Sequence, residues 1–382
     1  MITRSFLSDF FVNAGICSTL AISGLLFGAI LLSNRKRLSS EIFPRKSPKR
    51  KRAIRLFWMG FLLSMAVIIT ELLIIQVTSG LISYLSALRV GAYRINPSDA
   101  LGIGIPLWPM AIVGISCMAI GVNLFPSRGR RALFIILLVL WTLFEFLQGN
   151  RHLIVYLWII AIGASTIFVE FKLRNLRNIA ILGIVGYGLL AFVSGIRSVL
   201  PGFFRGENTV SDIINASSSF SWNGLRPSNN EFGGPFYSLV QTVNAPSPLY
   251  LGETYLDAVF MILPTRLYPG IKPAGVAADF AESVQMRFPT LAGVGFGFSP
   301  VAEAYLNYSF PGIPLVFFLI ALGWHWVGTL RYKGFQGILA YLVIIPECIN
   351  FNRYSLDGVL QEAAFAIIIV WIMSQLSKGR LD

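Results

Sequence analysis

Charged side chains are scarce in this chain of 382 residues. Only 13% of the residues are charged and 55% are hydrophobic, with a mean hydropathy of +0.68. A soluble domain has about 25% charged residues, so the composition excludes an ordinary soluble domain. The apolar residues also come in blocks of about 20, the length at which a helix crosses about 30 Å of hydrocarbon. The sequence therefore predicts an all-α polytopic membrane protein.

Cysteine and histidine are also rare, with three cysteines and two histidines in the whole chain. Cys17, Cys117 and Cys348 fall inside apolar blocks, and none has the spacing of a disulfide framework or a metal site. We expect all three to pack as small apolar side chains. No acidic cluster has metal-ligand spacing either, so we predict neither a metal nor a cofactor.

The apolar blocks predict nine spans, or about 9–10 transmembrane helices once soft boundaries are allowed for. Their connections alternate in basic content, and twenty of the 31 Lys and Arg residues lie on one side, ten of them in 33–55. The positive-inside rule makes that side cytoplasmic, which places the N-terminus outside and the C-terminus inside. The spans are 10–32, 56–78, 101–124, 132–148, 152–170, 179–199, 300–330 (interrupted), 338–351 and 360–377.

Eleven basic residues remain on the outer side, and ten of them are arginines. Arginine binds phosphate oxygens through two parallel donors and keeps its charge. Because the positive-inside rule disfavours these charges, their retention indicates an anionic ligand outside. The basic stretch 45–55 lies next to a span and is most simply a topogenic, lipid-facing segment, so we do not expect nucleic acid binding.

Residues 200–299 form the only large region outside the spans. Their Ser, Asn, Gly and aromatic residues predict a loop with turns rather than a helical domain. Within this loop, 255–263 is apolar but too short to span, so we expect a helix lying on or dipping into the membrane. The sequence thus divides into an N-terminal bundle of six spans (1–199), a large outer loop (200–299) and a C-terminal bundle of three spans (300–382).

The stretch GVGFGFSPVAEAYLNYSFPGIP at 293–314 places polar residues at the start of a span. Gly295 and Gly297 permit close backbone approach, and Ser299-Pro300 is a good helix start. Glu303 and Asn307 follow Ser299 at intervals of four residues, on one helix face. These spacings predict a polar pocket at the outer membrane surface.

A pair of prolines, Pro311 and Pro314, predicts that this span is broken after about three turns. Broken helices at membrane depth are tolerated only where they are buried in protein or line a wet cavity. An ionisable residue there, such as Glu303, is a candidate functional residue. Glu303 could alternatively form a structural ion pair with an arginine.

Three stretches together resemble a known family. They are Gly149-Asn150-Arg151 at a span end, LGETYLDAVFMILPTRLYPGIKP at 251–273 and GVGFGFSPVAEAYLNYSFPGI at 293–313. The chain resembles the O-antigen or oligosaccharide repeat-unit polymerases (Wzy-type). In that family a G-x-R caps a mid-chain span, and a segment with a Pro/Arg pair and KP precedes a G-x-G-x-S-x-x-x-E-x-Y-x-N helix.

The resemblance implies a glycosyltransferase of the bacterial inner membrane. It would transfer the growing glycan from its undecaprenyl diphosphate to the terminal sugar of a fresh lipid-linked repeat unit, at the periplasmic face. The outer side is then periplasmic, with the N-terminus there and the C-terminus in the cytoplasm. The product is a surface polysaccharide: O-antigen, capsule or exopolysaccharide. A chain-length regulator and a flippase are candidate partners.

This chemistry assigns roles to the outer polar residues. Arginines stabilise the charge that develops on the diphosphate leaving group, and a carboxylate takes the proton of the attacking sugar hydroxyl. Glu303 is our candidate base, with Asp257 and Asp279 as alternative carboxylates. The predicted leaving-group residues are Arg197, Arg266 and Arg287, and the predicted substrate-binding residues are Arg151, Arg205, Lys272, Gly295, Gly297, Ser299, Tyr305 and Asn307.

Two alternatives share parts of this pattern. An O-antigen ligase uses the same substrates, but that family relies on a histidine in its outer loop, and 200–299 contains none. A membrane transporter or flippase for lipid-linked sugars would favour repeated halves and broken helices near the midplane. This chain has no visible internal duplication, and its one broken helix is expected near the outer surface.

Overall fold

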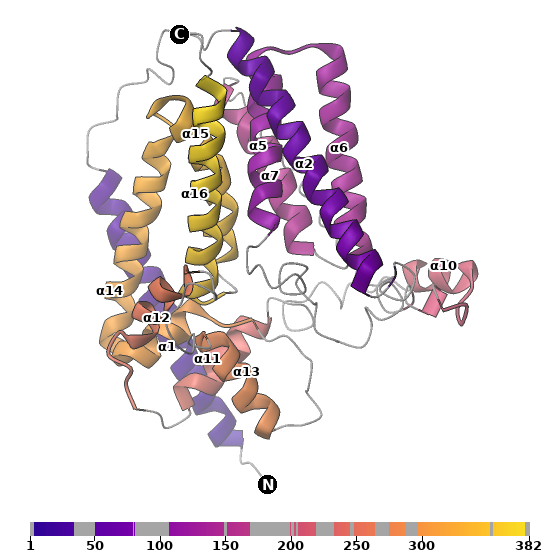
Figure 1. The fold of residues 1–382 in the computed structure, drawn as a ribbon. Helices are drawn as coiled ribbons and strands as arrows, with labels where there is room; N and C mark the ends of the chain where they lie inside the picture. Colours follow the sequence, from indigo (N-terminus) through magenta and orange to yellow (C-terminus); the bar gives the residue numbers. More distant parts are fainter. Residues whose placement is uncertain are drawn as a thin grey trace. The chain divides into compact units, whose positions relative to one another are not determined.

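Twelve α-helices and no strand make up the described part of the chain (Figure 1). This computed structural model describes residues 4–33, 50–78, 80, 107–148, 151–168, 199, 202–203, 205–218, 233–244, 248–263, 275–287, 297–351 and 354–378. The predicted all-α class is therefore confirmed.

The described helices coincide with eight of the nine predicted spans, and the ninth, 179–199, lies almost wholly outside the described residues. Four of the helices that the structure describes are long and apolar enough to cross a membrane, as expected for a polytopic membrane protein. These four are α1 (Arg4–Ser33), α2 (Arg50–Thr78), α14 (Pro300–Leu330) and α16 (Leu356–Lys378). The other four are α5 (Trp108–Leu124), α6 (Arg128–Gln148), α7 (Arg151–Phe168) and α15 (Gly334–Asn350).

The chain forms two compact units. Residues 1–47 and 230–365 belong to the first, and 48–229 and 366–382 belong to the second. The sequence-based division at 199 and 299, which separates membrane bundles from an outer loop, stays a prediction.

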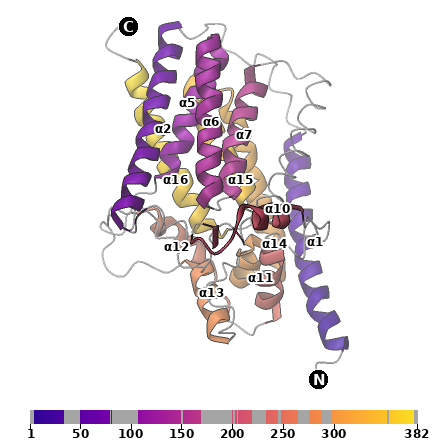
Figure 2. The ribbon, with the colours of Figure 1, turned by 90° about the vertical axis from the view of Figure 1, so that its right-hand side faces the viewer.

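In the first unit, α1 lies along α14 (Figures 1 and 2). Glycines on α1 make this possible: a Cβ at Gly24 would collide with the backbone of Pro314, and one at Gly28 would lie 2.6 Å from the Cβ of Ala321. Small residues let membrane helices approach closely, because their backbones can touch. The buried core between these helices and α11 (Gly233–Asn244) includes Ala14, Cys17, Ala21, Leu239, Val243, Phe298, Ala302, Ile313 and Phe317.

The prediction that 200–299 is a loop without a helical domain is wrong. Four short helices lie in it: α10 (Val210–Ser218), α11, α12 (Glu253–Met261) and α13 (Val276–Arg287). Helices of nine to twelve residues are marginal on local propensity and take their stability from packing. Tertiary contacts of this kind leave little signal in composition. The predicted apolar helix at 255–263 is confirmed as α12, displaced by two residues at each end.

In the second unit, α5 is buried along most of its length and packs against α2, α6 and α7. Again glycine sets the spacing. A Cβ at Gly60 of α2 would lie 2.5 Å from the carbonyl oxygen of Gly114 and 2.7 Å from the Cβ of Cys117. A Cβ at Gly114 of α5 would in turn collide with the Ser64 hydroxyl of α2. This pair of helices is held by backbone proximity.

Candidate functional site

The start of α14 is built as the sequence predicts. Ser299 is the N-cap, with extended backbone angles, and its hydroxyl accepts a hydrogen bond from Val301 N at 3.2 Å. Pro300 occupies the first helical position. The Ser299 amide in turn donates to the hydroxyl of Ser238 on α11, at 3.0 Å. These bonds fix where the helix begins and attach it to a neighbouring element.

The predicted break in α14 is confirmed, and it lies at Ser309, whose φ of 56° and ψ of −161° are not helical. Pro311 two residues later has no N–H to donate and its ring crowds the preceding turn. The freed carbonyls find other donors: Leu306 O accepts from Tyr250 N, and Asn307 O accepts from Leu251 N, each at 3.1 Å. The chain before α12 therefore docks onto the break.

Asn307 binds this docked chain through its side chain and is fully buried. Its Oδ1 accepts from Gly252 N at 2.8 Å. Its Nδ2 donates to Thr254 Oγ1 at 2.7 Å and to Glu303 O at 2.9 Å. One amide thus joins α14 to the turn before α12 and to α12 itself.

Glu303, the predicted base, lies one turn before Asn307 and is 1% exposed. Its Oε1 accepts from Thr254 Oγ1 at 3.1 Å, and its Oε2 accepts from Leu356 N at 2.9 Å. Leu356 is the first residue of α16, so the carboxylate meets an orphan N–H at the positive end of that helix. We call residues 250–254, 299–309 and Leu356 the α14 junction.

Backbone strain is concentrated at the α14 junction. Leu251 and Ser309 have positive φ values of 50° and 56°, and they are the non-glycine residues of the described chain with such values. Gly252 follows with a φ of 98°, and a Cβ there would lie 2.5 Å from the Tyr308 hydroxyl. Strained backbone of this kind costs about 1–3 kcal/mol per residue and is typical of functional sites.

Aromatic rings lie within and next to the α14 junction. The rings of Tyr255 and Tyr308 lie 6.2 Å apart between centroids, and Tyr305 packs edge-on against Phe310 at 5.1 Å. Burial, and then the charge of Glu303 and the nearby Tyr308, raise the pKa of Tyr255 well above its ordinary value. The Tyr255 phenol therefore stays neutral and keeps its proton for donation.

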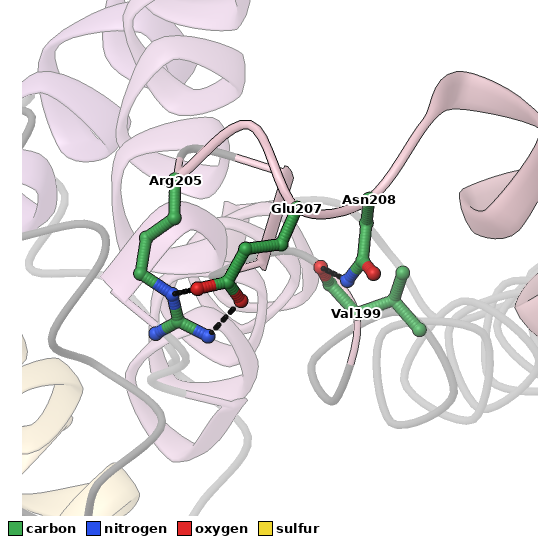
Figure 3. A network of polar contacts seen from close by, with 4 residues as sticks. All are labelled: Val199, Arg205, Glu207 and Asn208. Carbon is green, nitrogen blue, oxygen red and sulfur yellow. Dashed lines mark hydrogen bonds and ion pairs between the residues drawn. The ribbon is translucent and has the colours of Figure 1, made fainter.

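Arg205, predicted to bind substrate, belongs to the second unit. It sits in a turn in which Glu207 binds its side chain and Asn208 binds the backbone of Val199 (Figure 3). Its guanidinium donates to both carboxylate oxygens of Glu207, at 2.8 and 2.7 Å, and Asn208 Nδ2 donates to Val199 O at 2.9 Å. The arginine is thus already engaged in the bidentate geometry that suits a phosphate.

The other predicted residues are placed only in part. Gly297 is half-buried just before α14. Arg151 begins α7 and Arg287 ends α13, each described by its backbone alone. The remaining predicted residues, Arg197, Arg266, Lys272 and Gly295, lie outside the described residues.

Sequence reasoning missed the partners of Glu303 and Asn307. Thr254 accepts a hydrogen bond from Asn307 and donates one to Glu303, and the backbone N–H of Gly252 donates to Asn307. The available signal for these partners was the stretch LGETY, in which a glycine is followed by an acidic and a hydroxyl residue. Pairing it with a helix about 50 residues later requires the tertiary structure.

The α14 junction presents chemistry suited to handling a hydroxyl proton. Each oxygen of Glu303 accepts one hydrogen bond and has a further lone pair. Within the described ranges, no group of three or more His, Cys, Asp or Glu side chains is placed to bind a metal ion. The arrangement can accept a proton from a hydroxyl that reaches Glu303.

Comparison with protein families gives a match along nearly the whole chain. The family profile described as O-antigen polysaccharide polymerase Wzy matches residues 4–380. No curated protein sequence and no solved structure matches the chain at a significant level. The family match agrees with the resemblance at 251–273 and 293–313, and it favours the polymerase over the ligase and transporter alternatives.

Proposed function

The chain belongs to the O-antigen polysaccharide polymerase Wzy family, and we propose that it joins repeat units by direct displacement at a sugar–diphosphate bond, with Glu303 as the base. As a family member it is a membrane-bound polymerising glycosyltransferase that acts on lipid-linked O-antigen repeat units.

The proposed donor is the growing glycan on undecaprenyl diphosphate, and the acceptor is the terminal sugar of a fresh lipid-linked repeat unit. The acceptor hydroxyl oxygen bonds to the anomeric carbon, the bond from that carbon to the diphosphate oxygen breaks, and the lipid diphosphate leaves. The hydroxyl proton passes to Glu303. The observation that supports this assignment is a carboxylate in the first turn of a broken membrane helix, held in place by Thr254 and Leu356.

Negative charge grows on the leaving diphosphate, and the outer arginines are suited to stabilise it. Arg197, Arg266 and Arg287 take this role in the proposal, while Arg151, Arg205 and Lys272 bind the remainder of the donor. Asn307, Ser299 and Tyr305, with the glycines at 295 and 297, position the acceptor side. Because arginines supply the positive charge, the reaction is proposed to need no metal. Polymer synthesis by washed membranes in excess chelator checks that point.

The distribution of basic residues supports an orientation with the N-terminus in the periplasm and the C-terminus in the cytoplasm. The α14 junction then faces the periplasm, where a flippase delivers repeat units and a chain-length regulator acts on the product. Fusing a reporter that is active only in the periplasm to either terminus tests this orientation.

The test of the base is Glu303→Gln in a host that lacks the wild-type gene. Gln keeps an acceptor oxygen for Leu356 N, and its NH₂ can donate to the Thr254 hydroxyl, so the α14 junction can stay folded. We expect the long polysaccharide ladder to disappear while glycan with a single repeat unit persists. Equal protein abundance in the membrane is the control. A full ladder from Glu303→Gln would show that Glu303 is not the base.

A further inference from the structure

Two buried polar atoms beside Glu303 have no hydrogen-bond partner in the described structure. They are Oδ1 of Asp357 and the hydroxyl oxygen of Tyr255. Asp357 is only 9% exposed. Leaving a buried polar group without a partner is unfavourable, so such a group in a native structure calls for an explanation, and a ligand that binds there is one. Here two such atoms, contributed by α12 and α16, lie near the same carboxylate, which makes this place a candidate binding site.

The surrounding chain brings Asp357 to this position. It is the second residue of α16, directly after Leu356, whose amide donates to Glu303. Gly275 passes so close to Asp357 Oδ2 that a Cβ at this glycine would collide with the carboxylate. Gly275 O accepts the first hydrogen bonds of α13, from Ala278 N and Asp279 N. Two helix starts therefore meet at this carboxylate.

Tyr255 approaches the same carboxylate of Glu303 from α12. It follows Thr254, which donates to Glu303, and the charge of Glu303 is felt at its phenol. Because that phenol stays neutral, its O–H can donate a hydrogen bond, and its oxygen can also accept one. Asp357 and Tyr255 thus offer an acceptor and a donor in the neighbourhood of Glu303.

Charge decides which part of the substrate fits. Asp279 on α13 has a raised pKa because of burial and then because of the charges of Glu282, Asp257 and Asp357, so Asp357 belongs to a group of neighbouring carboxylates. Such a field repels a diphosphate. It favours a neutral ligand that donates to Asp357 Oδ1 and accepts from the Tyr255 O–H. Sugar hydroxyls do both, and Tyr308, whose ring lies 6.2 Å from that of Tyr255 and which is 38% exposed, offers an aromatic face beside them.

We propose that Asp357 and Tyr255 bind hydroxyl groups of the acceptor sugar next to Glu303. This inference rests on the proposed function, in which Glu303 takes the proton of the acceptor hydroxyl. It adds the subsite that recognises the acceptor and separates it from the diphosphate, which the outer arginines bind.

The experiment measures binding without any transfer. The probe is the host's own oligosaccharide repeat unit, released from its lipid diphosphate by mild acid and titrated calorimetrically into the full-length protein in nanodiscs. Asp357→Asn removes the charged acceptor, and we expect binding to weaken about tenfold or more. Tyr255→Phe removes only the hydroxyl, and we expect a loss of about threefold to tenfold.

A matched control is Thr242→Val, because the Thr242 hydroxyl on α11 is also buried without a partner in the described structure. Tyr255→Phe and Thr242→Val each delete an unpaired hydroxyl, so neither should lower the unfolding midpoint. Only the first should weaken binding. Unchanged binding in both Asp357→Asn and Tyr255→Phe, or equal weakening in Thr242→Val, would overturn the proposal. Because the probe carries no diphosphate, this result is independent of whether Glu303→Gln abolishes the ladder.

Discussion

At the α14 junction, buried amide, hydroxyl and carboxylate groups hold α12, α14 and α16 together, whereas α2 and α5 approach one another through glycines. The Asn307 side chain alone takes part in three hydrogen bonds. Gly60 and Gly114 instead bring two backbones to a separation that leaves no room for a Cβ. Hydrogen bonds hold the α14 junction, whereas close packing of two backbones holds α2 against α5.

The difference follows from the backbone at each place. α2 and α5 are regular helices whose backbone groups bond within the helix, so no polar partner is needed from outside. α14 is broken at Ser309, and the carbonyls of Leu306 and Asn307 must be satisfied by another segment. A break therefore draws polar groups together, and these are the groups that chemistry can use.

The largest expected effect comes from Asn307→Ala. It leaves Gly252 N, Thr254 Oγ1 and Glu303 O each short of one partner in a buried place. At about 1 kcal/mol or more for each such group, we expect a loss of about 3 kcal/mol in the free energy of unfolding, together with loss of the polysaccharide ladder. Thermal unfolding in nanodiscs measures the first.

Asn123→Ala in α5 is the matched control from the second unit. Asn123 Nδ2 makes a single bond within its own helix, to Ala119 O at 2.8 Å. Its removal should cost about 1 kcal/mol at most and leave the ladder intact. Equal losses from the two substitutions would contradict the view that Asn307 joins separate elements.

Gly60→Ala tests the close contact between α2 and α5. The new Cβ meets the Gly114 carbonyl oxygen and Cys117, and the backbone of α5 cannot move aside cheaply. We expect destabilisation of about 1–3 kcal/mol from overpacking. In the control Gly129→Ala, no atom lies within 4 Å of the new Cβ, so the unfolding midpoint should stay the same or rise. A Gly60→Ala protein as stable as Gly129→Ala would show that the α2–α5 contact is loose.

Ser299→Ala should have the smallest effect. It removes the hydroxyl that accepts from Val301 N, while the bond from the Ser299 amide to Ser238 remains. N-cap loss costs about 1 kcal/mol. Ser299→Thr keeps the cap and should retain wild-type stability within experimental error. If Ser299→Thr loses as much stability as Ser299→Ala, the Ser299 side chain contributes mainly by packing and not as a helix cap.

Much of the local structure of the α14 junction could be predicted from short sequence patterns. Ser299-Pro300 predicts the helix start, Pro311 predicts the break, and the spacing of Glu303 and Asn307 predicts their common face, and all of these are confirmed. The helices at 210–287 could not be read in the same way. They are short and lie in a stretch rich in turn formers, and for α11 and α12 it is contact with α14 that supplies what local propensity lacks.

The sequence by itself determined the class of molecule, the positions of its long apolar helices and its broken helix, because hydrophobic length, proline and capping residues act over a few neighbouring positions. Only the tertiary structure decided which groups meet Glu303. Thr254 and Leu356 lie about 50 residues away on either side, and Asp357 and Tyr255 join them. Hydrogen bonds between such distant residues depend on how the helices pack, and no local pattern encodes that packing.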